Sequence, residues 1–104
     1  MNQDARVLVV CEAVEVVEEQ VELSLEQLCR SCAAESTLVL ELVAHGLLEP
    51  AGASTEHWRF AGTSLTLTRR AQRLIEDLGL NVAGAAVVIE LLERIERLER
   101  QLRG

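Results

Sequence analysis

Residues 81–103 read Asn81-Val-Ala-Gly-Ala-Ala-Val-Val-Ile-Glu-Leu-Leu-Glu-Arg-Ile-Glu-Arg-Leu-Glu-Arg-Gln-Leu-Arg103. The apolar residues recur at spacings of three and four, the a/d seam of a coiled coil, at Val88, Leu91, Ile95, Leu98 and Leu102. Four Glu-to-Arg pairs at i,i+4 spacing each support such a helix by about 0.2–0.5 kcal/mol. At about 1.5 Å per residue the helix is roughly 35 Å long, more than a domain of this size covers from one side.

The apolar seam beyond Leu91 therefore needs a partner helix. A second copy of the chain is the simplest supplier, which predicts a homodimer joined through these helices. The alternative is a helix that folds back against its own domain. The seam pattern alone does not set the direction of the two helices in the dimer.

The composition is that of one small domain with an aliphatic core. The chain has 104 residues, of which 49% are hydrophobic and only 2% aromatic, so it supports one modest core. Trp58 and Phe60, the aromatic residues, are expected to be buried in it. No apolar run approaches the ~18 residues of a membrane span, and the first residues lack the pattern of a signal peptide. We expect a cytoplasmic protein with its three cysteines reduced.

The net charge of −7 is concentrated in the first half of the chain. Residues 1–50 carry ten acidic residues and two arginines, while residues 51–104 carry seven acidic residues and eight arginines. An acidic half repels phosphate backbones, whose neutralisation by Lys and Arg supplies most non-specific affinity for nucleic acid. The charge thus argues against a nucleic-acid partner and favours a basic protein surface.

Local signals divide the chain into an acidic arm at 1–19, a folded domain at 20–80 and the C-terminal helix at 81–104. Alternation predicts a short strand near Val21–Leu25 and a second candidate at Arg6–Val10. Ser24-Leu-Glu-Gln27 is a capping box that starts a helix ending near residues 33–34. A second helix is expected to begin after an N-cap at Ser36 and to end at Gly46. Two short helices joined by a tight turn form a helix-turn-helix.

A small wing and a third helix are expected to follow Pro50, which ends the second helix. The alternation in His57-Trp-Arg-Phe60 predicts a strand with its aromatic side chains on the buried side. Thr63 or Ser64 is expected to cap the third helix, and Gly79 is expected to end it. Asn81 is then the cap of the long helix.

No constellation for catalysis or metal binding stands out, and we expect neither enzymatic activity nor a cofactor. Cys29-Arg-Ser-Cys32 has the C-x-x-C spacing, but a structural zinc site needs a second ligand pair and only His45 and His57 could supply it. The thiols, including Cys11, are expected to pack as small apolar groups. His45 is expected in the last turn of its helix, where a cation is favoured.

The chain resembles the MerR-like winged helix-turn-helix group, and within it the CbpM-type chaperone modulators. The residues behind this are His45-Gly-Leu-Leu-Glu-Pro50, Trp58-Arg-Phe60, Arg73-Leu-Ile-Glu-Asp-Leu-Gly-Leu-Asn81, Gly84 and Ile89-Glu-Leu-Leu-Glu-Arg-Ile-Glu-Arg-Leu98. The resemblance implies a mainly α, winged helix-turn-helix fold with a long C-terminal dimerisation helix. It also implies binding to the J domain of a co-chaperone, the DnaJ-like protein CbpA. Such proteins block its stimulation of the Hsp70 chaperone DnaK and its DNA binding.

The charges of the second helix agree with a protein partner. A DNA-reading helix contacts bases and phosphates with Arg, Lys, Asn or Gln, and Ser36–His45 has none of these. From charge alone we expect Glu35, Glu41 and Glu49 to contact the partner. The alternative is a dimeric transcriptional regulator of the MerR group, whose phosphate contacts would come from Arg59, Arg69, Arg70 and Arg73. A third reading is a module that only dimerises within some other complex.

Overall fold

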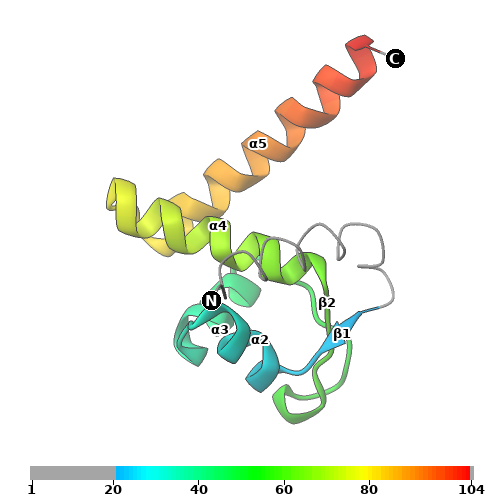
Figure 1. The fold of residues 1–104 in the computed structure, drawn as a ribbon, viewed down its shortest axis with the longest axis vertical. Helices are drawn as coiled ribbons and strands as arrows, with labels where there is room; N and C mark the ends of the chain where they lie inside the picture. The colour runs from blue at the N-terminus through cyan, green and yellow to red at the C-terminus, as the bar shows by residue number, and fades with distance from the viewer. Residues whose placement is uncertain (1–20, 104) are drawn as a thin grey trace, which may run out of the picture.

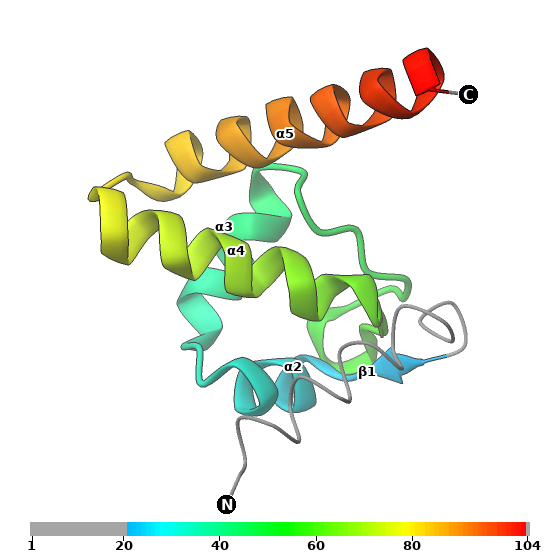
Figure 2. The same cartoon turned by 45° about the horizontal axis from the view of Figure 1, so that its top comes forward.

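Four α-helices, one 3-10 helix and a two-stranded sheet make up residues 21–103, the part of the chain that the computed structural model describes. In chain order they are β1 (Glu22–Leu23), α2 (Leu25–Cys32), α3 (Ser36–Ala44), η2 (Thr55–His57), β2 (Phe60–Ala61), α4 (Thr63–Leu78) and α5 (Val82–Arg103). Helices α2, α3 and α4 pack together, with the sheet beside them, and α5 crosses this body and continues past it (Figure 1, Figure 2). The mainly helical class predicted from the sequence is confirmed. The acidic arm and the candidate strand at Arg6–Val10 lie outside the described residues.

Helices α2 and α3 form the predicted helix-turn-helix. The capping box is present. The backbone N–H of Gln27 donates to Ser24 Oγ at 3.1 Å, and the backbone N–H of Ser24 donates to Gln27 Oε1 at 2.9 Å. Ala33 ends α2 in the left-handed region with φ 52°, which lets the chain turn sharply into α3. The expected Ser36 cap is wrong by one residue: Ser36 is already helical, and Glu35 is the N-cap without a side-chain hydrogen bond.

The wing is held by antiparallel pairing between residues far apart in the sequence. Glu22 pairs with Ala61 and Leu23 with Phe60, while Ala51 and Arg59 exchange two backbone hydrogen bonds of 2.9 and 2.8 Å. The predicted strand at 57–60 is therefore only partly right, because His57 belongs to η2 and the strand begins at Phe60.

Helix α4 follows β2, precedes α5 and packs against both of them and against α2. Its expected cap at Thr63 or Ser64 is wrong, since Gly62 is the N-cap and both residues are helical. Farther along, Arg69 Nη2 donates to the Ser31 carbonyl and Gln72 Nε2 donates to the Cys32 carbonyl, both at 3.1 Å. These two side chains satisfy carbonyls that the end of α2 leaves without helical partners.

The joint between α4 and α5 follows the local signals in the sequence. Gly79 ends α4 with φ 69°, a left-handed conformation that suits glycine. The Asn81 side chain then accepts a hydrogen bond from the Gly84 amide at 2.7 Å and so caps the start of α5. Both predictions are confirmed.

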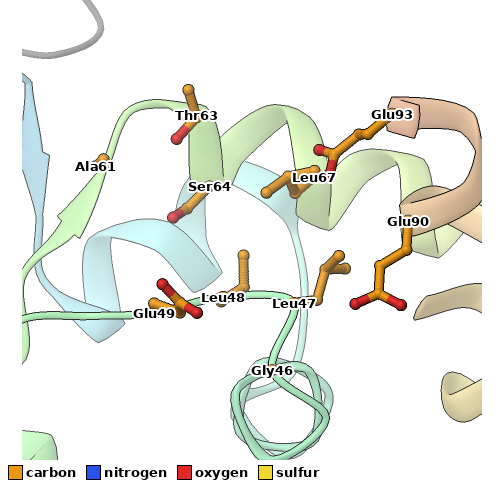
Figure 3. A pocket seen from close by; sticks show the side chains of 10 residues that line it. All are labelled: Gly46, Leu47, Leu48, Glu49, Ala61, Thr63, Ser64, Leu67, Glu90 and Glu93. Carbon is orange, nitrogen blue, oxygen red and sulfur yellow. The ribbon is translucent and has the colours of Figure 1, made fainter. Parts of the chain in front are cut away.

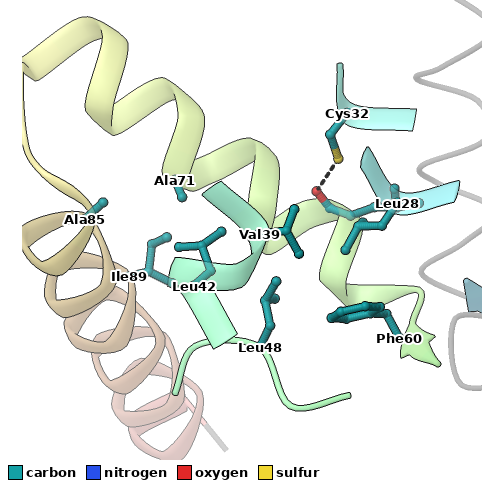
Figure 4. Close-up of a cluster of buried hydrophobic side chains, with 10 residues drawn as sticks. Leu28, Cys32, Val39, Leu42, Leu48, Phe60, Ala71, Ala85 and Ile89 are labelled. Atoms are coloured by element: carbon teal, nitrogen blue, oxygen red, sulfur yellow. Dashed lines mark hydrogen bonds between the residues drawn. The ribbon is translucent and has the colours of Figure 1, made fainter. Parts of the chain in front are cut away.

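A single hydrophobic cluster joins the four α-helices to the sheet (Figure 4). Leu28 of α2, Val39 and Leu42 of α3, Ala71 of α4 and Ile89 of α5 are fully buried in it. The cluster also contains Cys32, Leu48, Phe60, Leu65 and Ala85. Because α5 contributes Ala85 and Ile89, the first half of the long helix is part of the domain core rather than a separate rod.

Two glycines with positive φ allow a matched test of the wing. Gly52 has φ 120°, and a Cβ there would lie 2.5 Å from the His57 carbonyl oxygen, whereas Gly46 has φ 81° and open space around it. We expect Gly46→Ala to cost only backbone strain, about 1 kcal/mol. Gly52→Ala should cost at least about 2 kcal/mol more, since the backbone of η2 must move. Urea unfolding of both variants measures the difference, and equal losses would contradict this account of the wing.

Candidate functional site

The exposed face of α3 decides what the helix-turn-helix can bind, because the second helix of this motif is the one that enters DNA grooves. Thr37, Leu40, Glu41 and His45 are exposed there. Leu40 is a large apolar side chain with 38% of its surface accessible. Neither Lys nor Arg occurs in α3, so the face lacks the side chains that neutralise phosphates. Its mixture of apolar and acidic groups suits a basic protein surface better than a DNA groove.

The three predicted contact residues are exposed but do not share one face. Glu35 and Glu41 are six residues apart along α3, and at about 100° per residue their side chains leave the helix in different directions. Glu35, as the N-cap, also lies where the helix dipole favours a negative charge. Glu49 lies beyond α3, in the segment that leads to the wing. Whether these residues contact a partner stays a prediction.

Glu49 shares a pocket with two glutamates that the sequence interpretation did not select. Glu90 and Glu93 of α5 line the same pocket as Glu49, with the start of α4 on a further side (Figure 3). In the sequence these glutamates stand four residues before Arg94 and Arg97, a spacing that suggested helix-stabilising pairs alone. The position of each residue around the helix axis could have identified them. Glu93 lies one turn after the buried Ile89, on the side of α5 that faces the domain.

The arginines considered for DNA contacts mostly serve the fold. Arg69 donates to the Ser31 carbonyl, as described above, and Arg59 Nη1 donates to the Trp58 carbonyl at 3.1 Å. Arg70 Nη2 lies 3.7 Å from Glu96 Oε2 of α5, with both side chains partly exposed. Arg73 is exposed on α4. The structure thus uses three of these four arginines in contacts within the chain.

The second half of α5 presents an apolar stripe to solvent. Leu91, Ile95 and Leu98 are 50–58% exposed, and Leu102 is 87% exposed. At about 100° per residue, Leu91, Ile95 and Leu98 lie roughly 180–240° around the helix from the buried Ile89. The stripe therefore faces away from the chain's own core, and Val88 lies half-buried at its edge. Within residues 21–103 no helix is long and apolar enough to cross a membrane.

Cys29, Cys32 and the two histidines fill structural positions. Cys32 is buried, and its Sγ lies 3.8 Å from the Leu65 carbonyl oxygen (Figure 4). Burial raises the pKa of the Cys29 thiol, so it is less readily ionised to the reactive thiolate. His57 Nδ1 and Ser54 Oγ are hydrogen-bonded at 2.9 Å, and His45 is the C-cap of α3. Over the described part of the chain, no three His, Cys, Asp or Glu residues gather to hold a metal ion.

Comparison with known proteins assigns this arrangement to a family. Residues 23–104 match the model described as MerR HTH family regulatory protein. The chain is 36% identical over 81 residues to the chaperone modulatory protein CbpM of Pseudomonas putida (strain GB-1), covering 78% of this chain and 80% of that protein. It is 32% identical over 88 residues to CbpM of Coxiella burnetii (strain Dugway 5J108-111), covering 85% and 83%. The chain therefore belongs to the CbpM family of chaperone modulatory proteins, within the MerR-like helix-turn-helix group.

Proposed function

We propose that this protein is a chaperone modulator that binds the J domain of a CbpA- or DnaJ-like co-chaperone. Binding inhibits the co-chaperone's stimulation of the Hsp70 chaperone DnaK and its binding to DNA. The protein acts in the cytoplasm, by association alone and without catalysing a reaction. Membership in the CbpM family supports the chaperone-modulator role, and the resemblance noted in the sequence supports the J domain as the partner.

The observation that carries the proposal is the exposed face of α3. A helix-turn-helix that binds DNA needs cationic side chains at this position, and here the face offers Leu40 and Glu41 instead. An exposed leucine beside a carboxylate is suited to a partner with an apolar spot surrounded by Lys or Arg. In this proposal the chain uses the scaffold of a DNA-binding module to bind a protein.

Inhibition is steric in this proposal. The J domain binds across α3 and the adjoining segment around Glu49. This protein then covers the surface of the J domain that would otherwise engage DnaK. The test is the steady-state ATPase rate of DnaK with its co-chaperone and increasing amounts of this protein. We expect the stimulated part of the rate to fall to the basal level of DnaK, while the basal rate itself is unchanged. A stimulated rate that is constant at saturating protein would contradict the proposal.

Reversal of the charge at Glu41 tests the contact face directly. Glu41→Arg removes an attraction to a basic surface and adds a repulsion, each worth up to about 1 kcal/mol for exposed groups. The expected result is an increase of about tenfold in the dissociation constant for the J domain, with a salt dependence no steeper than that of the wild type. Titration calorimetry measures both quantities.

The control is Glu76→Arg, which makes the same charge change at an exposed position near the end of α4. Its dissociation constant should stay within about twofold of the wild-type value, because only the long-range field changes. Equal effects of the two substitutions would show that net charge matters and that Glu41 is not a contact.

We further propose that the protein is a homodimer joined through α5. The stripe of Leu91, Ile95, Leu98 and Leu102 is apolar, exposed and turned away from the core. Its spacing of three and four residues is that of a two-helix seam. A second copy offers the same stripe, so a twofold axis covers both at once.

A further inference from the structure

A pocket of about 370 Å³ lies between the segment after α3, the start of α4 and the middle of α5 (Figure 3). Its acidic lining comes from Glu49 on one side and from Glu90 and Glu93 on the other. None of these glutamates forms an ion pair with a residue that the structure describes, Arg94 and Arg97 included. Three carboxylates therefore border one cavity whose lining includes no arginine.

The pocket is also lined by a hydroxyl that forms no hydrogen bond within the described chain. Ser64, in the first turn of α4, is only 6% exposed and lines the pocket. Its hydroxyl is turned toward the side of the pocket where Glu49 lies (Figure 3), and within residues 21–103 it forms no hydrogen bond. Among the described residues only Thr68 Oγ1 is an enclosed side-chain oxygen without a partner, so the Ser64 oxygen is reached from the pocket and can accept a hydrogen bond from a group that enters it.

The remaining walls suit a long side chain with a charged end. Leu47 and Leu67 are half-buried and line the same pocket. Lysine and arginine side chains lay their methylene groups along such apolar surface and keep the charged group for polar partners. A carboxylate and a hydroxyl oxygen both accept hydrogen bonds from an ammonium or guanidinium group.

We propose that this pocket binds one lysine or arginine side chain of the partner protein. The cationic group lies among Glu49, Glu90 and Glu93 and donates to Ser64 Oγ, while its methylene stem packs on Leu47 and Leu67. The inference rests on the proposed J-domain binding and adds α5 to the contact surface. A helix that serves the core on one side then also contributes acidic residues to partner recognition.

The test is titration calorimetry of the full-length protein with the J domain of the host's CbpA-like co-chaperone. The double variant Glu90→Gln, Glu93→Gln keeps side-chain size and removes two charges from the pocket. We expect its dissociation constant to rise at least about tenfold, since hydrogen bonds to a charged group are lost or weakened. The matched control, Glu76→Gln with Asp77→Asn, removes two charges from the exposed end of α4 and should stay within about twofold.

A second variant separates the pocket from the stability of the fold. Ser64→Ala removes a hydroxyl that has no hydrogen-bond partner in the described chain, so the urea midpoint should stay the same or rise. The dissociation constant for the J domain should nevertheless increase about threefold or more. A purely structural role for Ser64 would lower the urea midpoint and leave the affinity unchanged.

The outcomes separate this inference from the proposed function. Wild-type binding that is weakened by the pocket variants and not by the control supports both. Wild-type binding that the pocket variants leave unchanged overturns the pocket and leaves the J-domain proposal standing. Absence of wild-type binding overturns both, because the inferred side chain belongs to that partner.

Discussion

Replacement of Ile95 by aspartate is expected to convert the dimer into monomers. Ile95 lies in the middle of the apolar stripe of α5 and is half exposed in the single chain. In a twofold dimer this substitution places two carboxylates in the seam, one from each copy. They replace two buried isoleucine side chains, whose burial contributes about 1.5–3 kcal/mol each. Charge in a dry interface costs several kcal/mol more. The dissociation constant of the dimer should therefore rise by at least about 100-fold, as measured by sedimentation velocity across a dilution series.

The control for this prediction is Arg97→Gln, which makes the same change in net charge on the same helix. Arg97 is exposed and lies outside the stripe, so its replacement should change the dissociation constant by less than about threefold. The fold of Ile95→Asp should be intact in far-UV circular dichroism, because Ile95 does not contribute to the buried core. A variant that sediments as the wild type at every concentration would contradict the dimer.

Replacement of Phe60 by alanine is expected to give the largest loss of folding stability. Phe60 is 1% exposed and packs edge to face with Trp58, with ring centroids 5.8 Å apart and an interplanar angle of 89°. Removal of a buried phenyl ring leaves a cavity and costs about 3–5 kcal/mol, a large part of the 5–15 kcal/mol typical of a domain. Urea unfolding, followed by the fluorescence of Trp58, measures the loss in free energy of unfolding. Trp58 is a suitable probe because its ring contacts Phe60.

Phe60→Leu is the matched variant, because leucine fills part of the space and should lose less than half as much stability. All proteins must be compared at one concentration, since a dimer links stability to concentration. A loss below about 1 kcal/mol for Phe60→Ala would show that the ring is not the centre of the wing's packing.

Local signals in the sequence predicted the helices well, and their ends less well. Ser24 with Gln27, Gly79 and Asn81 act through contacts within one turn, so the sequence alone contains their geometry. The starts of α3 and α4 were wrong by one or two residues, because a Ser or Thr near a helix start can be a cap or a first-turn residue. At α4 the backbone arriving from β2 makes Gly62 the cap.

The wing was only partly predictable, because its pairing joins distant parts of the chain. Alternation at 57–60 indicated a strand, yet pairing with Leu23 starts it at Phe60 and leaves His57 in a 3-10 turn. Such short strands depend on their tertiary neighbours more than on intrinsic preference.

The candidate contact surface depends on tertiary structure even more. Charge alone suggested Glu35, Glu41 and Glu49, but only the fold brings Glu49 to the same pocket as Glu90 and Glu93. In the sequence these last two are 41 and 44 residues from Glu49, and each belongs to a regular Glu–Arg spacing that explains it without a pocket. The stripe of α5 was readable from spacing, while its orientation away from the core needed the position of Ile89.

Binding to a J domain is the central claim, and titration calorimetry tests it most directly. The protein is titrated with the isolated J domain of the host's CbpA-like co-chaperone, and with the DnaJ J domain as control, at two temperatures so that a binding enthalpy near zero is not missed. The account predicts saturable binding of the CbpA-like domain and much weaker binding of the control. No heat with either domain at both temperatures would contradict it, and the DNA-binding alternative with Arg73 as a phosphate contact would then be the one to test.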